Sequence, residues 1–369
     1  MKASLAKFLL AIFILFGLYN KIYAQTVDKK PRYTYTVGAN AFTGSVVKHD
    51  RFMGHLSQGM TNGFEVMVNK NTYGHEVWEQ VFKYPDVGFS LSYFDYGSDK
   101  LGESIGGFLY VDFIFARSRK FEGIFKVGTG LAYHTNPYDN ENNNQNVAVG
   151  GKLTSSMQFR LGVNYKLTDR WKLTGGLTIS HFSVAAYTQP NKGVNIVTAN
   201  IGATYLLNQV IPEYQPLDKD YVWDKRLKYN INFSYSLKEI PPIGGPKYPV
   251  YVLTFSVNKQ ISKTSVLSLG VDAFSNTALK EEMIRSDIDP NILDHKRVGI
   301  AGGYELKMNN LSIIAQFGVY IYRPYKSDKP VYQRYGLRYH VTKNLFLNYS
   351  FVTHFAKADH YEWGIWITL

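Results

Sequence analysis

The feature that most constrains this chain is an alternation of apolar and polar side chains with a period of two, recurring from about residue 32 onward. In the segment 361–369, apolar side chains occupy every odd position, and Trp366 is the one apolar exception among the even positions. Such alternation is typical of strands with one apolar face. Because most segments reach the ~9–11 residues that cross a bilayer as a tilted strand, they favour a membrane barrel over a soluble sandwich.

The connections between these segments support the same fold class. Short polar turns such as 117–120 and 168–169 alternate with long polar loops such as 135–149 and 184–193. Outer-membrane barrels have short periplasmic turns and longer extracellular loops. We therefore predict an all-β, antiparallel outer-membrane β-barrel of about 14–16 strands. Two long connections, 69–85 and 208–225, break the alternation, and the sequence offers no physical reason for them.

The chain divides into four expected parts. Residues 1–24 have the charged start, apolar middle and small-residue end of a secretory signal peptide. Residues 25–207 carry a first set of barrel strands, residues 208–225 form a connecting segment, and residues 226–369 carry additional C-terminal strands. Two arrangements stay open, since the C-terminal strands either extend the same barrel or form a second sheet.

Composition agrees with an exported membrane barrel. The chain has no cysteine, 29 tyrosines, 15% aromatic residues and only 19% charged residues. The absence of cysteine excludes disulfides, thiol catalysis and thiolate metal sites. The formal net charge is +12, and removing the three lysines of the signal peptide leaves +9. Export argues against nucleic acid as the anionic partner, so phosphorylated surface lipid and solvated loop lysines remain the two explanations.

The segment HFSVAAYTQPNKGVN, residues 181–195, contains the strongest candidate site. Odd positions form the apolar face of the two strands that flank it, so His181, Ser183 and Asn195 should all project outward at the extracellular rim. A histidine two residues from a serine on one face is the minimum for an activated nucleophile, and a third group must orient the base. Rim residues without a catalytic role show the same pattern, so geometry alone leaves both interpretations open.

The same segment resembles the signature of the lipid A 3-O-deacylase family of outer-membrane barrels. In that family a His-x-Ser-Asn run is followed by a Gln-Pro-Asn-x-Gly-like turn and by a glutamate fourteen residues after the histidine. Matching residues here are His181, Ser183, Gln189, Pro190, Asn191 and Gly193. The resemblance covers about residues 60–207, including the segment 75–91, and implies an eight-stranded unit to which the C-terminal strands are an extension.

The resemblance also implies roles for individual residues. His181 would be the general base, Ser183 the nucleophile, and Asn195 would stand where the family has its acid. Beyond these family roles, we expect Lys192 to meet lipid A phosphates and a backbone N–H near Ala185 to hold the oxyanion, and no metal or cofactor is needed. Two positions depart from the family pattern, because Val184 replaces an asparagine and Asn195 replaces a glutamate.

Three functions follow as hypotheses. The first is an outer-membrane serine esterase that removes an acyl chain from the lipid A of lipopolysaccharide. The second is a channel or transport barrel, since about sixteen strands in one barrel would enclose a pore, with the loop 276–296 folded inward. The third is a surface-binding barrel that has lost the chemistry, for which Val184 is the best argument. The sequence sets no oligomeric state.

Overall fold

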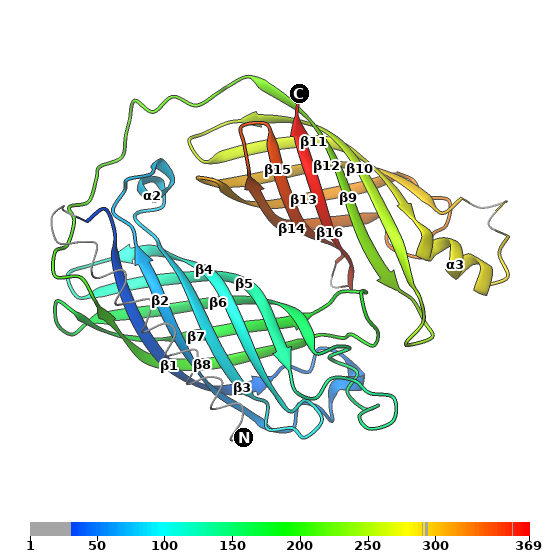
Figure 1. Cartoon of the computed structure of the whole chain (residues 1–369), viewed down its shortest axis with the longest axis horizontal. Coiled ribbons are helices and arrows are strands. Elements are labelled where there is room, and N and C mark those ends of the chain that lie inside the picture. The colour runs from blue at the N-terminus through cyan, green and yellow to red at the C-terminus, as the bar shows by residue number, and fades with distance from the viewer. Residues whose placement is uncertain (1–30, 290, 292–293, 356) are drawn as a thin grey trace.

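The computed structural model describes residues 31–289, 291, 294–355 and 357–369, so the predicted signal peptide lies outside the described residues. Within them the chain forms two closed antiparallel barrels of eight strands each, β1–β8 and β9–β16. Figure 1 shows the two barrels side by side, joined by one long segment. Among the described residues, no helix is long and apolar enough to cross a membrane.

The first barrel is closed along most of the length of its first and last strands. β1 pairs with β8 from Thr36 opposite Leu206 to Val46 opposite Ile196. Its strands are β1 (Thr34–Val46), β2 (Met60–Asn71), β3 (Asp86–Asp95), β4 (Glu103–Arg117), β5 (Phe121–His134), β6 (Leu153–Lys166), β7 (Trp171–Ser183) and β8 (Val194–Leu206).

The second barrel is closed along only part of its length. β16 pairs with β9 from Thr368 opposite Asn230 to Trp363 opposite Tyr235, and no further pairs of these two strands follow within the described residues. Its strands are β9 (Leu227–Glu239), β10 (Lys247–Gln260), β11 (Ser265–Asn276), β12 (Lys296–Met308), β13 (Leu311–Tyr322), β14 (Val331–His340), β15 (Leu345–His354) and β16 (Lys357–Thr368).

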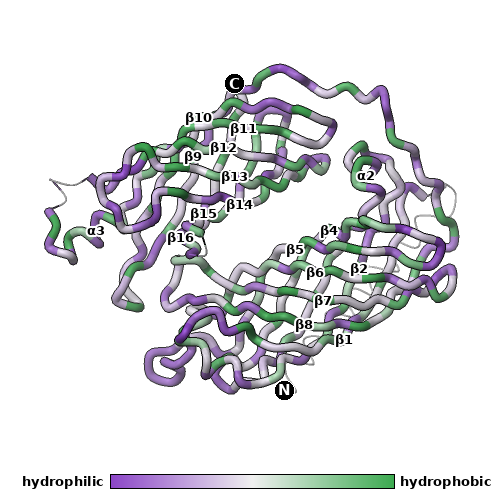
Figure 2. The backbone as a smooth tube through the Cα atoms, turned by 180° about the vertical axis from the view of Figure 1, so that it is seen from behind, coloured by the Kyte–Doolittle hydropathy of each residue, from purple (hydrophilic) through white to green (hydrophobic). Residues whose placement is uncertain are grey.

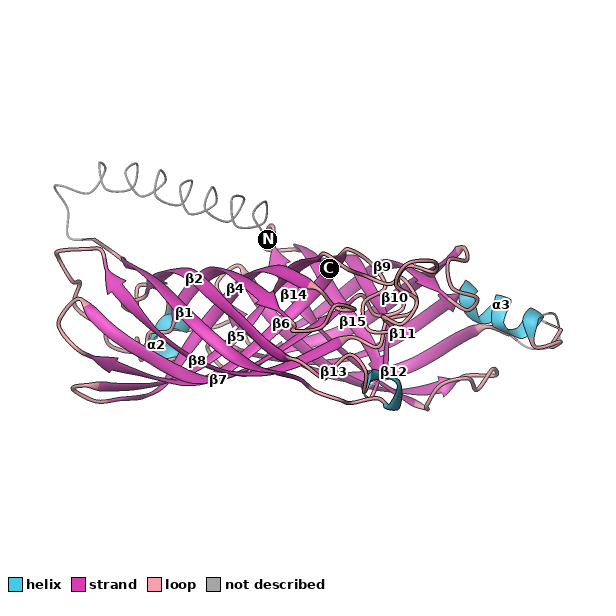
Figure 3. Cartoon of the chain, turned by 90° about the horizontal axis from the view of Figure 1, so that it is seen from below, coloured by secondary structure: helices cyan, strands magenta, loops and turns pink. Residues whose placement is uncertain are grey.

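The predicted strand count is confirmed, and the open question about the C-terminal strands is answered by a second barrel. The pore expected from one barrel of about sixteen strands is therefore wrong, because eight strands enclose an interior that side chains can fill. The predicted inward folding of loop 276–296 is wrong for its helical part. Helix α3 (Thr277–Arg285) extends away from the barrel end (Figures 1 and 3).

The two connections that broke the turn pattern contact each other. The β2–β3 connection contains the short helix α2 (Val77–Val81), which starts with a capping box between Glu76 and Glu79. The linker between the barrels runs past it, and the Gln215 backbone N–H donates to the Tyr73 carbonyl oxygen at 2.7 Å. The Tyr84 hydroxyl donates to the Gln215 carbonyl oxygen at 2.9 Å. The two segments therefore contact each other at the turn end of the first barrel.

The faces of the strands follow the predicted alternation. Outward side chains such as Leu177 and Ile201 are 61% and 72% exposed, as expected for a surface covered by lipid. Figure 2 shows hydrophobic and hydrophilic residues alternating along the strands of both barrels. The apolar exception Trp366 lies in the lumen of the second barrel, 1% exposed, with the Arg338 guanidinium 4.0 Å from its ring centroid.

The lumen of the first barrel is filled in two layers. At its middle, Glu65 accepts hydrogen bonds from Arg160 at 2.6 Å and Asn40 at 2.9 Å, and Lys126 lies 3.6 Å away. Beneath the long loops an apolar cluster fills the barrel end, and three of its members are Phe94, Phe182 and Ile196. Phe182 of β7 and Ile196 of β8 are members, so this cluster packs against the inner face of both strands.

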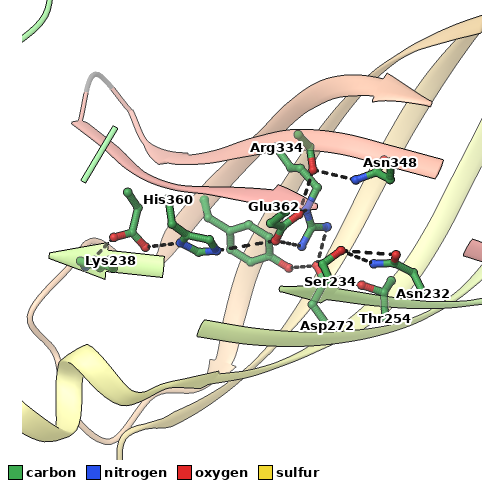
Figure 4. A network of polar contacts seen from close by, with 12 residues as sticks. Asn232, Ser234, Lys238, Thr254, Asp272, Arg334, Asn348, His360 and Glu362 are labelled. Atoms are coloured by element: carbon green, nitrogen blue, oxygen red, sulfur yellow. Dashed lines mark hydrogen bonds and ion pairs between the residues drawn. The ribbon is translucent and has the colours of Figure 1, made fainter. Parts of the chain in front are cut away.

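The lumen of the second barrel holds a chain of charged side chains (Figure 4). Arg334 donates to Glu362 at 2.7 Å and to Asp272 at 3.0 Å. His360 lies 3.7 Å from Glu362 and 3.0 Å from Asp359, whose carboxylate accepts from Lys238 at 2.6 Å. Buried charges of both signs satisfy one another here, as polar groups in a barrel interior must.

Candidate active site

His181 and Asn195 face each other across two neighbouring strands. They are directly paired positions of β7 and β8, on the outer face and near the end that carries the long loops. The His181 Nδ1 atom lies 2.6 Å from the Asn195 Oδ1 atom. Because an amide oxygen only accepts, Nδ1 carries the hydrogen and Nε2 is left free to accept a proton. The pair therefore has the arrangement of a base and the group that orients it.

Ser183 is the last residue of β7, two positions beyond His181 on the same face. Its Oγ atom accepts from the Ala185 backbone N–H at 3.1 Å and from the Asn191 Nδ2 at 2.8 Å. Ala185 has φ +51°, a left-handed conformation that turns the chain so that its N–H points back at Ser183. Two donors thus converge on the serine oxygen from the β7–β8 loop.

Asn191 belongs to the site although sequence reasoning gave it no role. Besides the bond to Ser183, its side-chain amide donates to the Ala185 carbonyl oxygen at 2.7 Å. Its signal in the sequence is its place in the Gln189–Pro190–Asn191 turn, which is part of the family signature. What the sequence could not show is that this turn folds back so that its asparagine reaches the serine.

His181 and Ser183 both lie close to Gly193, where a side chain would not fit. A Cβ atom built on it would lie 2.9 Å from the His181 Cε1 atom and 3.6 Å from the Ser183 Cβ atom. Its φ of +77° also favours glycine. In this conformation of residues 181–195, no hydrogen bond joins the His181 imidazole to the Ser183 hydroxyl. Catalytic hydrogen bonds are often long or misaligned before substrate binds.

The second barrel packs against this segment, which the sequence did not predict. The Tyr361 hydroxyl of β16 donates to the Ser183 carbonyl oxygen at 3.1 Å. The Ala186 N–H donates to the Asp359 carbonyl oxygen at 3.3 Å, and the Glu239 N–H donates to the Ala186 carbonyl oxygen at 2.7 Å. As a result Ser183 is only 6% exposed although it points outward from its own barrel.

Lys192, expected to meet lipid phosphate, forms an ion pair within the loops. Its Nζ atom lies 3.0 Å from the Asp50 Oδ2 atom, and its side chain remains 44% exposed. The Phe52 backbone N–H and Lys192 hold the pKa of Asp50 below its ordinary value. Among the described residues, no group of three or more His, Asp or Glu side chains is arranged to hold a metal ion.

Comparison with known proteins identifies both barrels. Residues 62–204 match the family model described as lipid A 3-O-deacylase (PagL), and residues 227–369 match the model described as acyloxyacyl hydrolase, C-terminal domain. The first match runs from within β2 to within β8 and leaves out β1, and the second begins with β9 and includes every strand of the second barrel. No curated protein matches the chain.

Solved outer-membrane proteins are similar only distantly. Omp33 of Acinetobacter baumannii is 9% identical, with 92% of this chain and 100% of that chain covered and a TM-score of 0.18. The toluene transporter TodX of P. putida is 11% identical, with 92% and 90% covered and a TM-score of 0.18. With such low TM-scores these similarities support no conclusion about this chain. The two family matches together show that the chain belongs to the lipid A 3-O-deacylase family, in a form that carries an acyloxyacyl hydrolase C-terminal domain.

Proposed function

We propose that this protein is an outer-membrane serine esterase that removes one ester-linked acyl chain from the lipid A of lipopolysaccharide. The observation that carries the proposal is the 2.6 Å contact between His181 and Asn195 beside Ser183, on the outer wall of the first barrel. Lipopolysaccharide fills the outer leaflet around such a wall. The long loops at this end indicate the extracellular side, which supports a substrate drawn from the outer leaflet.

The reaction would proceed through an acyl-enzyme. Ser183 Oγ attacks the ester carbonyl carbon while its proton passes to His181 Nε2. The bond between that carbon and the sugar oxygen then breaks, and His181 returns the proton to the sugar oxygen. Water attacks the acyl-serine with His181 again taking and returning a proton, which releases a free fatty acid and regenerates Ser183. Water is the only co-reactant.

The oxyanion of each tetrahedral intermediate needs preorganised donors, and Asn191 and Ala185 are placed to supply them. Both already donate to Ser183 Oγ, at 2.8 and 3.1 Å. The oxyanion is bonded to the same carbon that Oγ has attacked, so it lies close to Oγ. Small shifts therefore bring both donors to it. Neither donor comes from the side chain at position 184, so Val184 does not by itself remove these two contacts.

Asn195 orients the base without supplying a negative charge. An asparagine serves this purpose in Cys-His-Asn sites. The cost is that the imidazolium formed during the reaction lacks a carboxylate to balance it. We therefore expect a slower enzyme than one with an acid at this position, with the same chemistry.

The direct test uses purified full-length protein in detergent micelles with lipid A as substrate. Mass spectrometry is expected to show a product lighter by one acyl chain together with the free fatty acid. A fluorophosphonate probe, which captures activated serines, is expected to label Ser183 in the mapped peptides. Unchanged lipid A together with unlabelled Ser183, in protein shown to be folded, would overturn the proposal.

A further inference from the structure

The second barrel has a gap in its wall, and the candidate site segment fills it. β16 and β9 pair only from Trp363 to Thr368, so their ends near Asp359 and Glu239 are separated. Ala186 bridges these two ends through its own N–H and carbonyl groups. The first barrel thereby satisfies strand edges of the second, and the second fixes the backbone that follows Ser183.

Tyrosines on the outer face of the second barrel extend this contact. Besides the bond from Tyr361 to Ser183, the Tyr349 hydroxyl lies 2.7 Å from the hydroxyl of Ser155, which is paired with Ser183 across β6 and β7. The rings of Tyr349 and Tyr361 are stacked with centroids 5.6 Å apart. The two tyrosines therefore form one surface against the outer wall of the first barrel.

We propose that the second barrel positions the catalytic segment, and that Tyr361 is a positioning residue for it. The inference rests on the proposed function. Ala185 must keep a left-handed backbone to direct its N–H at Ser183, a conformation that a non-glycine residue holds only where its surroundings impose it. Anchors on both sides, at the Ser183 carbonyl and at Ala186, impose it here.

Tyr361→Phe and Tyr361→Ala test this role, with Tyr335→Phe and Tyr335→Ala as matched controls. Tyr335 lies on the same outer face, 42% exposed, with its ring centroid 5.6 Å from that of Phe351. Losing the Tyr361 hydroxyl is expected to lower kcat roughly five-fold with KM unchanged, since one neutral hydrogen bond is removed. Tyr361→Ala should lower kcat further, and the rate of fluorophosphonate labelling at Ser183 should fall in parallel.

The outcomes separate this inference from the proposed function. If both Tyr361 variants keep the wild-type kcat and labelling rate while Ser183→Ala is inactive, the positioning role is wrong and the esterase stands. If KM rises and kcat stays constant, the tyrosine binds lipid instead of positioning the segment, which also overturns the inference. If the wild-type protein neither deacylates lipid A nor is labelled at Ser183, the proposed esterase function itself is wrong.

A second, independent observation concerns His49, in the loop between β1 and β2. Its Nε2 atom lies 3.0 Å from the Lys192 carbonyl oxygen, so Nε2 carries a hydrogen. In the neutral ring Nδ1 is then an acceptor, and it lies 3.1 Å from the Asn195 Nδ2 atom. The Val47 carbonyl oxygen, also 3.1 Å from Nδ1, is a non-bonded neighbour in this tautomer.

This contact decides which end of the Asn195 amide faces His181. The two ends of an amide have nearly the same shape, so packing alone does not distinguish them. With its NH₂ group held by His49, Asn195 presents its oxygen to His181 Nδ1–H. A rotated amide would present a donor and favour the wrong imidazole tautomer, the defect that makes an aspartate-to-asparagine change in a serine protease triad so damaging.

We infer that His49 is a second positioning residue, which fixes the amide that replaces the family's acid. The inference rests on the proposed function.

Three variants test this role through kcat and KM at neutral pH. His49→Asn keeps an acceptor near the Nδ1 position, whereas His49→Ala removes the acceptor. The control is His55→Asn, because His55 lies in the same loop and its ring contacts the Gln145 carbonyl oxygen, at 2.8 Å, and no group of the candidate site among the described residues. His55→Asn should keep the wild-type kcat, and KM should stay unchanged in all three variants, because the Asn195 amide acts on His181 and not on the substrate.

His49→Asn should keep most of the wild-type kcat, and His49→Ala should lose roughly ten-fold, which corresponds to one net hydrogen bond. A wild-type kcat in His49→Ala, or an equal loss in His49→Asn and His49→Ala, would overturn the role of His49 while Ser183→Ala still reports on the esterase. Equal losses in His49→Ala and His55→Asn would show a general effect of the loop, which also contradicts it.

Discussion

Replacing Ser183 with alanine is expected to lower the rate of lipid A deacylation at least about 10³-fold, because the nucleophile of an acyl transfer has no substitute nearby. His181→Ala should cost a similar factor, and the double variant should be no slower than either single one, since the two residues act as a unit. The measurement is the initial rate of fatty acid release from lipid A micelles by purified, folded protein.

The matched control for this prediction is Ser180→Ala. Ser180 lies on the same strand but faces the lumen, 2% exposed, and the alanine should leave the rate unchanged. A Ser183→Ala protein that retains more than about a tenth of the wild-type rate would show that another group is the nucleophile, because residual catalysis from the oxyanion donors alone is far smaller.

Replacing Asn191 with alanine is expected to give the second largest loss, ~10²–10³-fold in kcat, as for the removal of one oxyanion donor. Its side-chain amide donates to both Ser183 Oγ and the Ala185 carbonyl oxygen. The variant therefore loses one oxyanion donor and also loses a contact that holds the second donor, the Ala185 N–H. Asn191→Asp should be equally slow, because it keeps the shape of the side chain and replaces the donor with an acceptor. KM should change little, since the donor acts mainly in the transition state.

Asn140→Ala in the exposed β5–β6 loop serves as the control for Asn191. Its side-chain oxygen accepts from the Tyr138 hydroxyl, at 3.3 Å, and contacts no group of the candidate site among the described residues, so its loss should not affect the rate. A loss in KM alone for Asn191→Ala would indicate that the amide binds lipid A in its ground state. A wild-type rate would show that Ala185 N–H suffices as the donor.

The sequence predicted those features that depend on a period of two residues. A strand alternates its faces without regard to the rest of the fold, so the outward positions of His181 and Asn195 follow from counting from Trp171 and Val197. The strand count followed for the same reason. The division into two barrels did not, because local alternation is identical whether β8 pairs with β1 or with β9.

The site residues that the sequence missed come from loops and from distant parts of the chain. His49 reaches Asn195 across 146 positions, and Tyr361 reaches Ser183 across 178. No pattern within either segment encodes such contacts. Ala186 is a further example, because its bonding to Glu239 and Asp359 depends on a gap in another barrel that only the folded chain has.

Because the first barrel is closed along more of its length than the second, the two halves of the chain would differ in aggregation if they were made as separate fragments. A chain cut after Leu206 keeps the whole pairing of β1 with β8 and so a continuous wall. A chain that begins at Leu227 keeps its closing pairs only from Trp363 onward, and it has no Ala186 to bond Glu239 and Asp359. Unpaired strand edges are templates for pairing with other chains. The C-terminal half alone therefore carries an aggregation-prone edge that the intact protein covers with its own loop.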